Sequence, residues 1–114
     1  MSVNRIHIIG NMGKDPEMSY KGQDGSMTVT KVSVAVSDRN DKTNWFNVTA
    51  FGKTAEYLNN YGRKGRKVYV DGRMQMSRWQ DKEGQNRTSW ELVANQVEFL
   101  DSKSDNDLNE PDDI

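Results

Sequence analysis

Several residue types that support covalent cross-links or metal chemistry are absent or scarce. The 114 residues include no cysteine, two prolines and one histidine, His7. Without cysteine neither disulfides nor thiolate metal sites can form, which fits a reducing compartment. A lone imidazole is a poor start for a metal site, so we expect a structural role for His7. We expect no metal and no other cofactor.

Long apolar runs are also missing. Only 33% of the residues are hydrophobic, a low fraction for a globular domain. No run is long enough for a signal peptide or a membrane span. The length fits one domain with a small core. We therefore expect no membrane contact and a cytoplasmic location.

Positive charge is unevenly distributed along the chain. Residues 101–114 hold six acidic residues and one lysine, a net charge of −5, whereas residues 1–100 carry +4. A basic body with an acidic tail suggests a polyanionic ligand. The alternative on charge alone is an ordinary solvated surface with a frayed end. The tail is polar and has no aromatic residue, so we expect 101–114 to be disordered.

The stretch 44–53, NWFNVTAFGK, alternates as a strand does. Successive side chains of a strand point to opposite faces. One face carries Trp45 and Phe51, about 20 Å apart, and Lys53 follows the strand. Aromatic residues spaced along a strand beside cations are typical of a single-strand nucleic-acid platform; the alternative is a strand buried on both faces. The other row, expected to face the core, consists of Phe46, Val48 and Ala50.

Strand periodicity recurs in four other stretches, and one stretch has helical spacing. Strands are expected at 4–11, 26–37, 44–51, 68–79 and 88–99, and a helix at 54–61. This order predicts an all-β fold, a five-stranded OB-fold barrel with one short helix between strands 3 and 4. The barrel domain is expected to span residues 1–100.

Two tryptophans of the last two strands receive different predictions. Trp79 opens the hairpin loop at 81–84 with Arg78 beside it. A tryptophan among cations at a loop tip is a poor core residue, so we expect a binding role. Trp90 shares its face with Leu92 and Ala94, so we expect it in the core.

Three segments then carry a resemblance to a known family. They are VNRIHIIGNMGKDPEMSY, NWFNVTAFGKTAEY and RKGRKVYVDGRMQMSRWQDKEGQNR. Over roughly residues 3–100 the chain resembles the bacterial and bacteriophage single-stranded DNA-binding protein family. The resemblance implies an OB-fold and a homo-oligomer, a tetramer built from dimers or a dimer, in which first strands pair.

The resemblance also implies a set of binding residues. Base stacking falls on Trp45, Phe51 and Trp79, and phosphate contacts fall on Lys53, Lys64 and Arg78. Neighbouring cations in the basic turn at 63–67 and in the last two strands extend the predicted set. These further candidates are Arg66, Arg73, Lys82 and Arg87.

The chain departs from the family pattern in three places. Residues 38–41 lack the aromatic that many members carry there, so one stacking site is missing. Gln75 and Ser77 replace basic residues, which predicts a smaller electrostatic contribution. The tail ends in Asp112, Asp113 and Ile114 without the usual Pro-Phe ending. The short tail resembles a phage or plasmid member, which would act in the host cytoplasm and recruit replication or recombination proteins through these three residues.

The predicted function is sequence-independent binding and protection of single-stranded DNA during replication, recombination and repair. One alternative is an RNA-binding or primosome-type accessory module on the same barrel, which competition between poly-dT and poly-U would distinguish. The other alternative is a nuclease. Its metal would need clustered carboxylates, but the acidic residues of the body are scattered and no nucleophile and base stand together. We therefore expect no enzymatic activity.

Overall fold

The computed structural model describes residues 1–101. The predicted tail from residue 102 onward, including Asp112, Asp113 and Ile114, lies outside the described residues. Asp101 is described, and its carboxylate forms an ion pair of 3.0 Å with Arg66. Packing within the domain therefore extends at least to Asp101.

The fold is all-β with one short helix, as the sequence predicts. The helix lies between the third and fourth of the expected strands. One further strand, β2, falls in a stretch where none was expected. The elements are β1 (Ile6–Met12), β2 (Glu17–Lys21), β3 (Met27–Ser37), β4 (Thr43–Phe51), α1 (Gly52–Tyr61), β5 (Lys67–Gln80) and β6 (Asn86–Phe99).

Strand β2 pairs with the first half of β3, from Glu17 opposite Lys31 to Lys21 opposite Met27. All five of its residues are exposed. Its residues, EMSYK, alternate between polar and apolar side chains, which is the pattern of a strand. The sequence therefore carried a sign of β2, and the prediction of five strands was one strand short.

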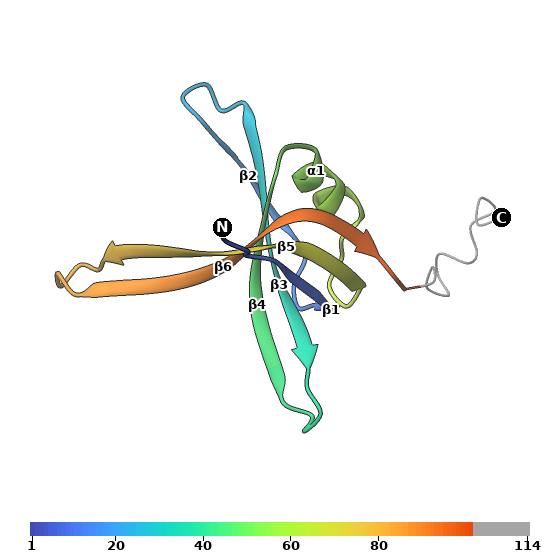
Figure 1. The fold of residues 1–114 in the computed structure, drawn as a ribbon. Coiled ribbons are helices and arrows are strands. Elements are labelled where there is room, and N and C mark those ends of the chain that lie inside the picture. The colour runs from blue at the N-terminus through green and yellow to red at the C-terminus, as the bar shows by residue number, and fades with distance from the viewer. Residues whose placement is uncertain (102–114) are drawn as a thin grey trace.

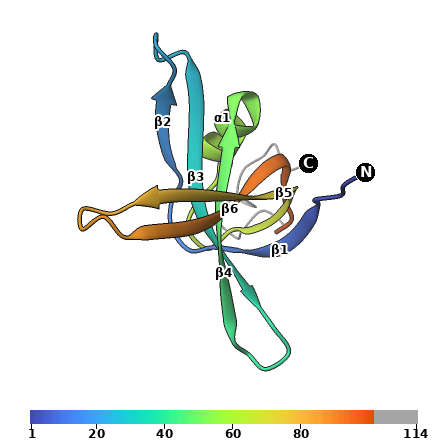
Figure 2. The same cartoon turned by 60° about the vertical axis from the view of Figure 1, so that its left-hand side comes forward.

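Five strands close into a barrel in the order β1-β5-β6-β4-β3, and β2 lies outside it next to β3. Strand β1 closes the ring because it pairs with β5 along residues 6–11 and with β3 through Asn11 and Met12. Strands β4 and β6 pair in parallel, at Val48 and Leu92. The OB-fold barrel predicted from the strand order is confirmed, with β2 added (Figures 1 and 2).

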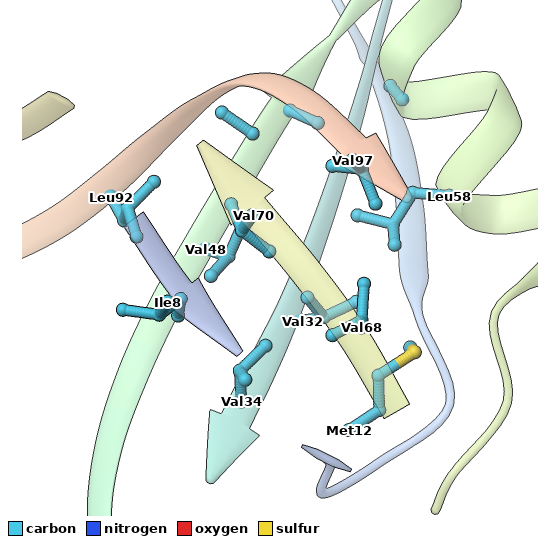
Figure 3. Close-up of a cluster of buried hydrophobic side chains, with 13 residues drawn as sticks. Ile8, Met12, Val32, Val34, Val48, Leu58, Val68, Val70, Leu92 and Val97 are labelled. Carbon is cyan, nitrogen blue, oxygen red and sulfur yellow. The ribbon is translucent and has the colours of Figure 1, made fainter. Parts of the chain in front are cut away.

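The core consists of the inward rows of these strands, closed at one end by α1. Val48 and Ala50 are fully buried and Phe46 packs against them, so the predicted core row of β4 is confirmed. From the helix, Leu58 enters the cluster beside Val97 (Figure 3). The hydroxyl of Thr30 donates a hydrogen bond of 2.8 Å to the carbonyl of Ala55, which fixes the helix on β3.

Three hairpins extend from the barrel, built from β2–β3, β3–β4 and β5–β6 (Figure 1). Strands β5 and β6 have 14 residues each, and their last buried pair is formed by Leu92 and the partly buried Met74. Trp90 lies one step further out, opposite Met76, and is 55% exposed. The prediction that Trp90 is a core residue is wrong. The row that contains Leu92 and Trp90 faces the core at Leu92 but already lies outside the barrel at Trp90.

Two glycines allow the strands to approach closely where the barrel bends. A Cβ added at Gly10 would collide with the carbonyl oxygen of Ala35, and one at Gly72 with that of Val93. Gly72 also borders the irregularity in the pairing of β5 with β6. We expect Gly10→Ala and Gly72→Ala each to lower the free energy of unfolding by about 1–3 kcal/mol, because overpacking displaces backbone.

Urea denaturation followed by circular dichroism measures this effect. The matched control is Ser19→Ala on exposed β2, which should change stability by no more than about 0.5 kcal/mol. Wild-type stability in both glycine variants would contradict the close-packing interpretation.

Candidate nucleic-acid interface

The outward row of β4 presents two aromatic side chains. Trp45 is 61% exposed and Phe51 is 41% exposed, so the alternative of a strand buried on both faces does not hold at these positions. They pair with Ala35 and Val29 of β3, whose short side chains leave the rings uncovered. The row can therefore offer two π-faces to a ligand.

Trp45 packs on Gly13, in the loop that follows β1. A Cβ added at Gly13 would collide with Cζ3 of the Trp45 ring. The backbone N–H of Gly13 donates a hydrogen bond of 2.8 Å to the carbonyl of Ser33. The loop thus supports one edge of the indole while most of the ring stays open to solvent.

The β5–β6 hairpin, called the arm below, has two faces set by its register. Paired residues of an antiparallel ladder point to the same side. Trp79 opposite Arg87 and Ser77 opposite Ser89 lie on the first side. We call this side the groove face, comprising Gln75, Ser77, Trp79, Arg87, Ser89 and Glu91. The opposite side is the back face, comprising Met76, Arg78, Thr88 and Trp90.

A hydrogen bond joins the groove face to β4. The hydroxyl of Thr49 donates to a carboxylate oxygen of Glu91 at 2.6 Å. Thr49 belongs to the same outward row as Trp45 and Phe51. The row of β4 and the groove face are therefore one continuous surface, on which Trp79 is 51% exposed.

This surface contains an open hollow of about 480 Å³. Its lining includes Phe51, Ser77 and Glu91, together with the loop that joins β1 to β2. Its cations are Lys14, Lys21 and Lys31, and its acids are Asp15, Glu17 and Glu91. The lining of the hollow thus carries equal numbers of cations and acids, and the smaller electrostatic contribution stays a prediction.

The tip of the arm is held by Asp81. Its carboxylate accepts hydrogen bonds from the backbone N–H groups of Glu83 and Gln85, both at 2.9 Å, and from Arg87 Nε at 3.0 Å. The bond from the Gln85 N–H, helped by Arg87, lowers the pKa of Asp81 below its usual value. The turn that carries Trp79 is thus ordered by one ionised carboxylate.

The structure places the predicted cations in several groups. Arg87 lies on the groove face with Trp79, Arg73 lies in the same row of β5 next to Gln75 on the barrel side, and Lys82 lies in the loop at the tip. Arg78 lies on the back face. The backbone N–H of Lys64 donates to Asp15 at 2.8 Å, which sets Lys64 beside the hollow.

Of two further predicted cations, Lys53 lies in the first turn of α1 and Arg66 follows the end of the helix. Lys53 borders a separate depression with Tyr57 and Glu98. The guanidinium of Arg66 binds Asp101, donates to the carbonyl of Tyr61 at 2.8 Å, and lies 4.3 Å from the ring centre of Phe99. These contacts give Arg66 a structural role, and a phosphate contact there stays a prediction.

Three exposed side chains at this surface were not among the predicted binding residues. They are Lys14, Lys21 and Lys31. Lys31 alternates with the buried Val32, which could have marked it as outward-facing. The other two depend on how β2 folds back onto β3 beside the loop after β1, which the chain does not reveal locally.

Two further observations bear on the class of site. Among residues 1–101, no three histidine, aspartate or glutamate side chains converge as a metal site requires. In the same part of the chain, no helix has the length and apolar character needed to cross a membrane.

The contact between Gly13 and Trp45 can be tested directly. We expect Gly13→Ala to turn the indole away from the loop, because the added methyl group takes the place of the ring. Tryptophan emission should shift and binding of oligo-dT should weaken, with the thermal unfolding midpoint nearly unchanged.

Ser33→Ala is the matched control, because it leaves the backbone bond to Gly13 and the ring contact in place. Wild-type emission and affinity in Gly13→Ala would show that the loop does not position Trp45.

Comparisons with known proteins show the family of the chain. The model of the "Single-strand binding protein family" matches residues 3–100. The chain is 40% identical to "Single-stranded DNA-binding protein 1" of Xylella fastidiosa, over 92% of this chain and 82% of the relative. It is 38% identical to the "Single-stranded DNA-binding protein" of Neisseria meningitidis, over 93% of this chain, and spans 64% of that relative's length. A match over nearly the whole described domain shows that the chain belongs to the single-strand binding protein family.

Proposed function

We propose that this protein binds single-stranded DNA without sequence preference, by stacking bases on Trp45, Phe51 and Trp79. Its family consists of non-enzymatic DNA-binding proteins. Roles in replication, recombination and repair are general to such proteins, and we propose them here. The observation that carries the proposed mechanism is the continuous surface on which these three rings lie exposed.

Stacking explains why sequence does not matter. Every base has a π-face, and stacking on an aromatic side chain contributes about 1–3 kcal/mol per base. Trp45 and Phe51 are separated by about 20 Å along β4, and Trp79 lies beyond them on the arm. An open surface with spaced rings holds an extended strand, whereas an enclosed pocket would select one base.

Phosphate contacts supply the rest of the binding free energy. The proposed contacts are made by the cations of the hollow, Lys14, Lys21 and Lys31, and by Lys53, Lys64 and the cations of the arm. Acids of the hollow reduce the local positive potential, but two of them are engaged within the protein. Asp15 accepts from the Lys64 N–H and Glu91 accepts from Thr49.

We also propose that the protein forms a homo-oligomer, a tetramer or a dimer, through β1. Within the described chain, residues 6–10 of β1 pair with β5 alone, so one strand edge is free there. Beside it Ile9 is 49% exposed, and His7 bonds the Tyr69 hydroxyl at 2.8 Å. A free edge with an exposed apolar side chain can pair with a second copy.

Recruitment of replication or recombination proteins by Asp112, Asp113 and Ile114, and a cytoplasmic location, remain proposals from the sequence alone.

The first test of the stacking mechanism uses intrinsic fluorescence. Oligo-dT should quench tryptophan emission, because Trp45 and Trp79 contact bases in the proposed complex. Trp45→Ala and Trp79→Ala should each remove part of the quench and cost about 1–3 kcal/mol of binding free energy. Both side chains are more than half exposed, so the fold should persist.

The matched control is Tyr61→Ala, which removes an aromatic residue of similar exposure on α1. It should leave the affinity for oligo-dT unchanged. Normal binding by both tryptophan variants would refute the stacking surface.

The second test measures the salt dependence of binding. The logarithm of the affinity should fall linearly with the logarithm of the salt concentration, with a slope of roughly −0.7 per phosphate contact. Lys31→Ala should reduce the magnitude of that slope by about one contact without creating a base preference.

Lys67→Ala is the control, since Lys67 is an exposed lysine at the opposite end of β5 from the arm tip. An affinity that does not depend on salt would contradict the phosphate contacts.

A further inference from the structure

The arm carries an exposed tryptophan on each of its two faces. Trp79 lies on the groove face, and Trp90 lies on the back face with 55% of its surface exposed. Of the two faces of the arm, the stacking residues proposed above use only the groove face, through Trp79. The back face therefore presents a large aromatic ring to which no role has been assigned.

The neighbours of Trp90 suit a nucleic-acid strand. Its direct cross-strand partner is Met76, and the next pair outward is Arg78 opposite Thr88. Arg78 is thus the diagonal neighbour of Trp90, a separation that a long side chain can span. One π-face, a flanking cation and a hydroxyl are the groups that a base and its phosphate require.

The size of the apolar area favours a strand over a protein partner. The back face beyond the barrel offers one tryptophan and the 38% exposed Met76, bounded by polar Arg78 and Thr88. A stable protein interface buries about 800 Å² on each partner around an apolar centre. A base needs only one exposed ring.

We propose that Trp90 is a fourth base-stacking residue and that Arg78 contacts the adjacent phosphate. The proposal rests on single-stranded DNA binding as the function. Neighbouring strands of a sheet are about 5 Å apart, so the two-stranded arm is thin and a bound strand can bend round its edge. The strand then passes from Trp79 on the groove face to Trp90 on the back face.

The direct test makes Trp90 the sole tryptophan, in the double variant Trp45→Phe with Trp79→Phe. Phenylalanine retains a stacking ring at both positions. Binding is followed by the anisotropy of a dye-labelled oligo-dT, and Trp90 emission is recorded in the same titration. We expect Trp90 emission to fall in step with binding.

Affinity gives an independent measurement in the otherwise unchanged chain. Trp90→Ala should weaken binding of oligo-dT roughly 5- to 150-fold, the range for one stacked base, whereas Trp90→Phe should recover most of the loss. Circular dichroism and thermal unfolding should show both variants folded, because Trp90 lies outside the barrel. Tyr61→Ala serves again as the control of matched exposure.

Several outcomes overturn the proposal. Binding of the labelled oligonucleotide without any change in Trp90 emission would do so, as would wild-type affinity in Trp90→Ala. A Trp90→Ala variant with altered sedimentation and unchanged affinity would assign Trp90 to a protein contact. If the double variant binds too weakly to titrate, the affinity of Trp90→Ala decides alone. Failure of the unmodified protein to bind oligo-dT would instead refute the proposed function.

Discussion

Closure of the barrel is the constraint on which the other features depend. Strand β1 pairs with β5 on one edge and with β3 on the other. The close contact at Gly10 brings β1 against β3, and the one at Gly72 brings β5 against β6. A closed barrel has a fixed interior, which accepts only a few side chains from each strand. Because β5 and β6 have 14 residues each, much of their length must lie outside it. Exposed aromatic residues on the arm follow from this excess of strand over interior.

Local alternation in the sequence was sufficient to predict what lies inside the barrel. The row Phe46, Val48 and Ala50 faces the core as expected. The same pattern failed for Trp90. Alternation shows on which side of a strand a residue lies, but it does not show where along the strand that side stops facing the core. Strand β2 was also not predicted, although its five residues alternate between polar and apolar side chains, because it lies outside the barrel and is short. Both failures concern the boundary of the barrel, which depends on contacts between distant segments.

The candidate site shows the same division. Trp45, Phe51 and Trp79 could be selected from the sequence since aromatic residues beside cations or polar residues are unsuited to a core, and the structure leaves all three exposed. The cations were harder to select, because the sequence does not show whether a basic side chain is free to bind phosphate or is already paired with a group of the protein. Arg66 illustrates this: its guanidinium is occupied by Asp101, the Tyr61 carbonyl and the Phe99 ring. Lys14, Lys21 and Lys31 come together only when β2 folds back on β3.

The two halves of the surface differ in how firmly their rings are held, and this difference bears on how a strand is bound. Trp45 rests on Gly13, whose backbone is bonded to β3 in the body of the barrel. Trp79 lies near the tip of a two-stranded arm, whose turn is ordered by Asp81. A ring fixed before binding loses little conformational freedom when a base stacks on it. In the proposed complex Trp45 is such a ring, whereas Trp79 is held only through the two-stranded arm and its Asp81 turn, so we expect the two positions to contribute differently to binding.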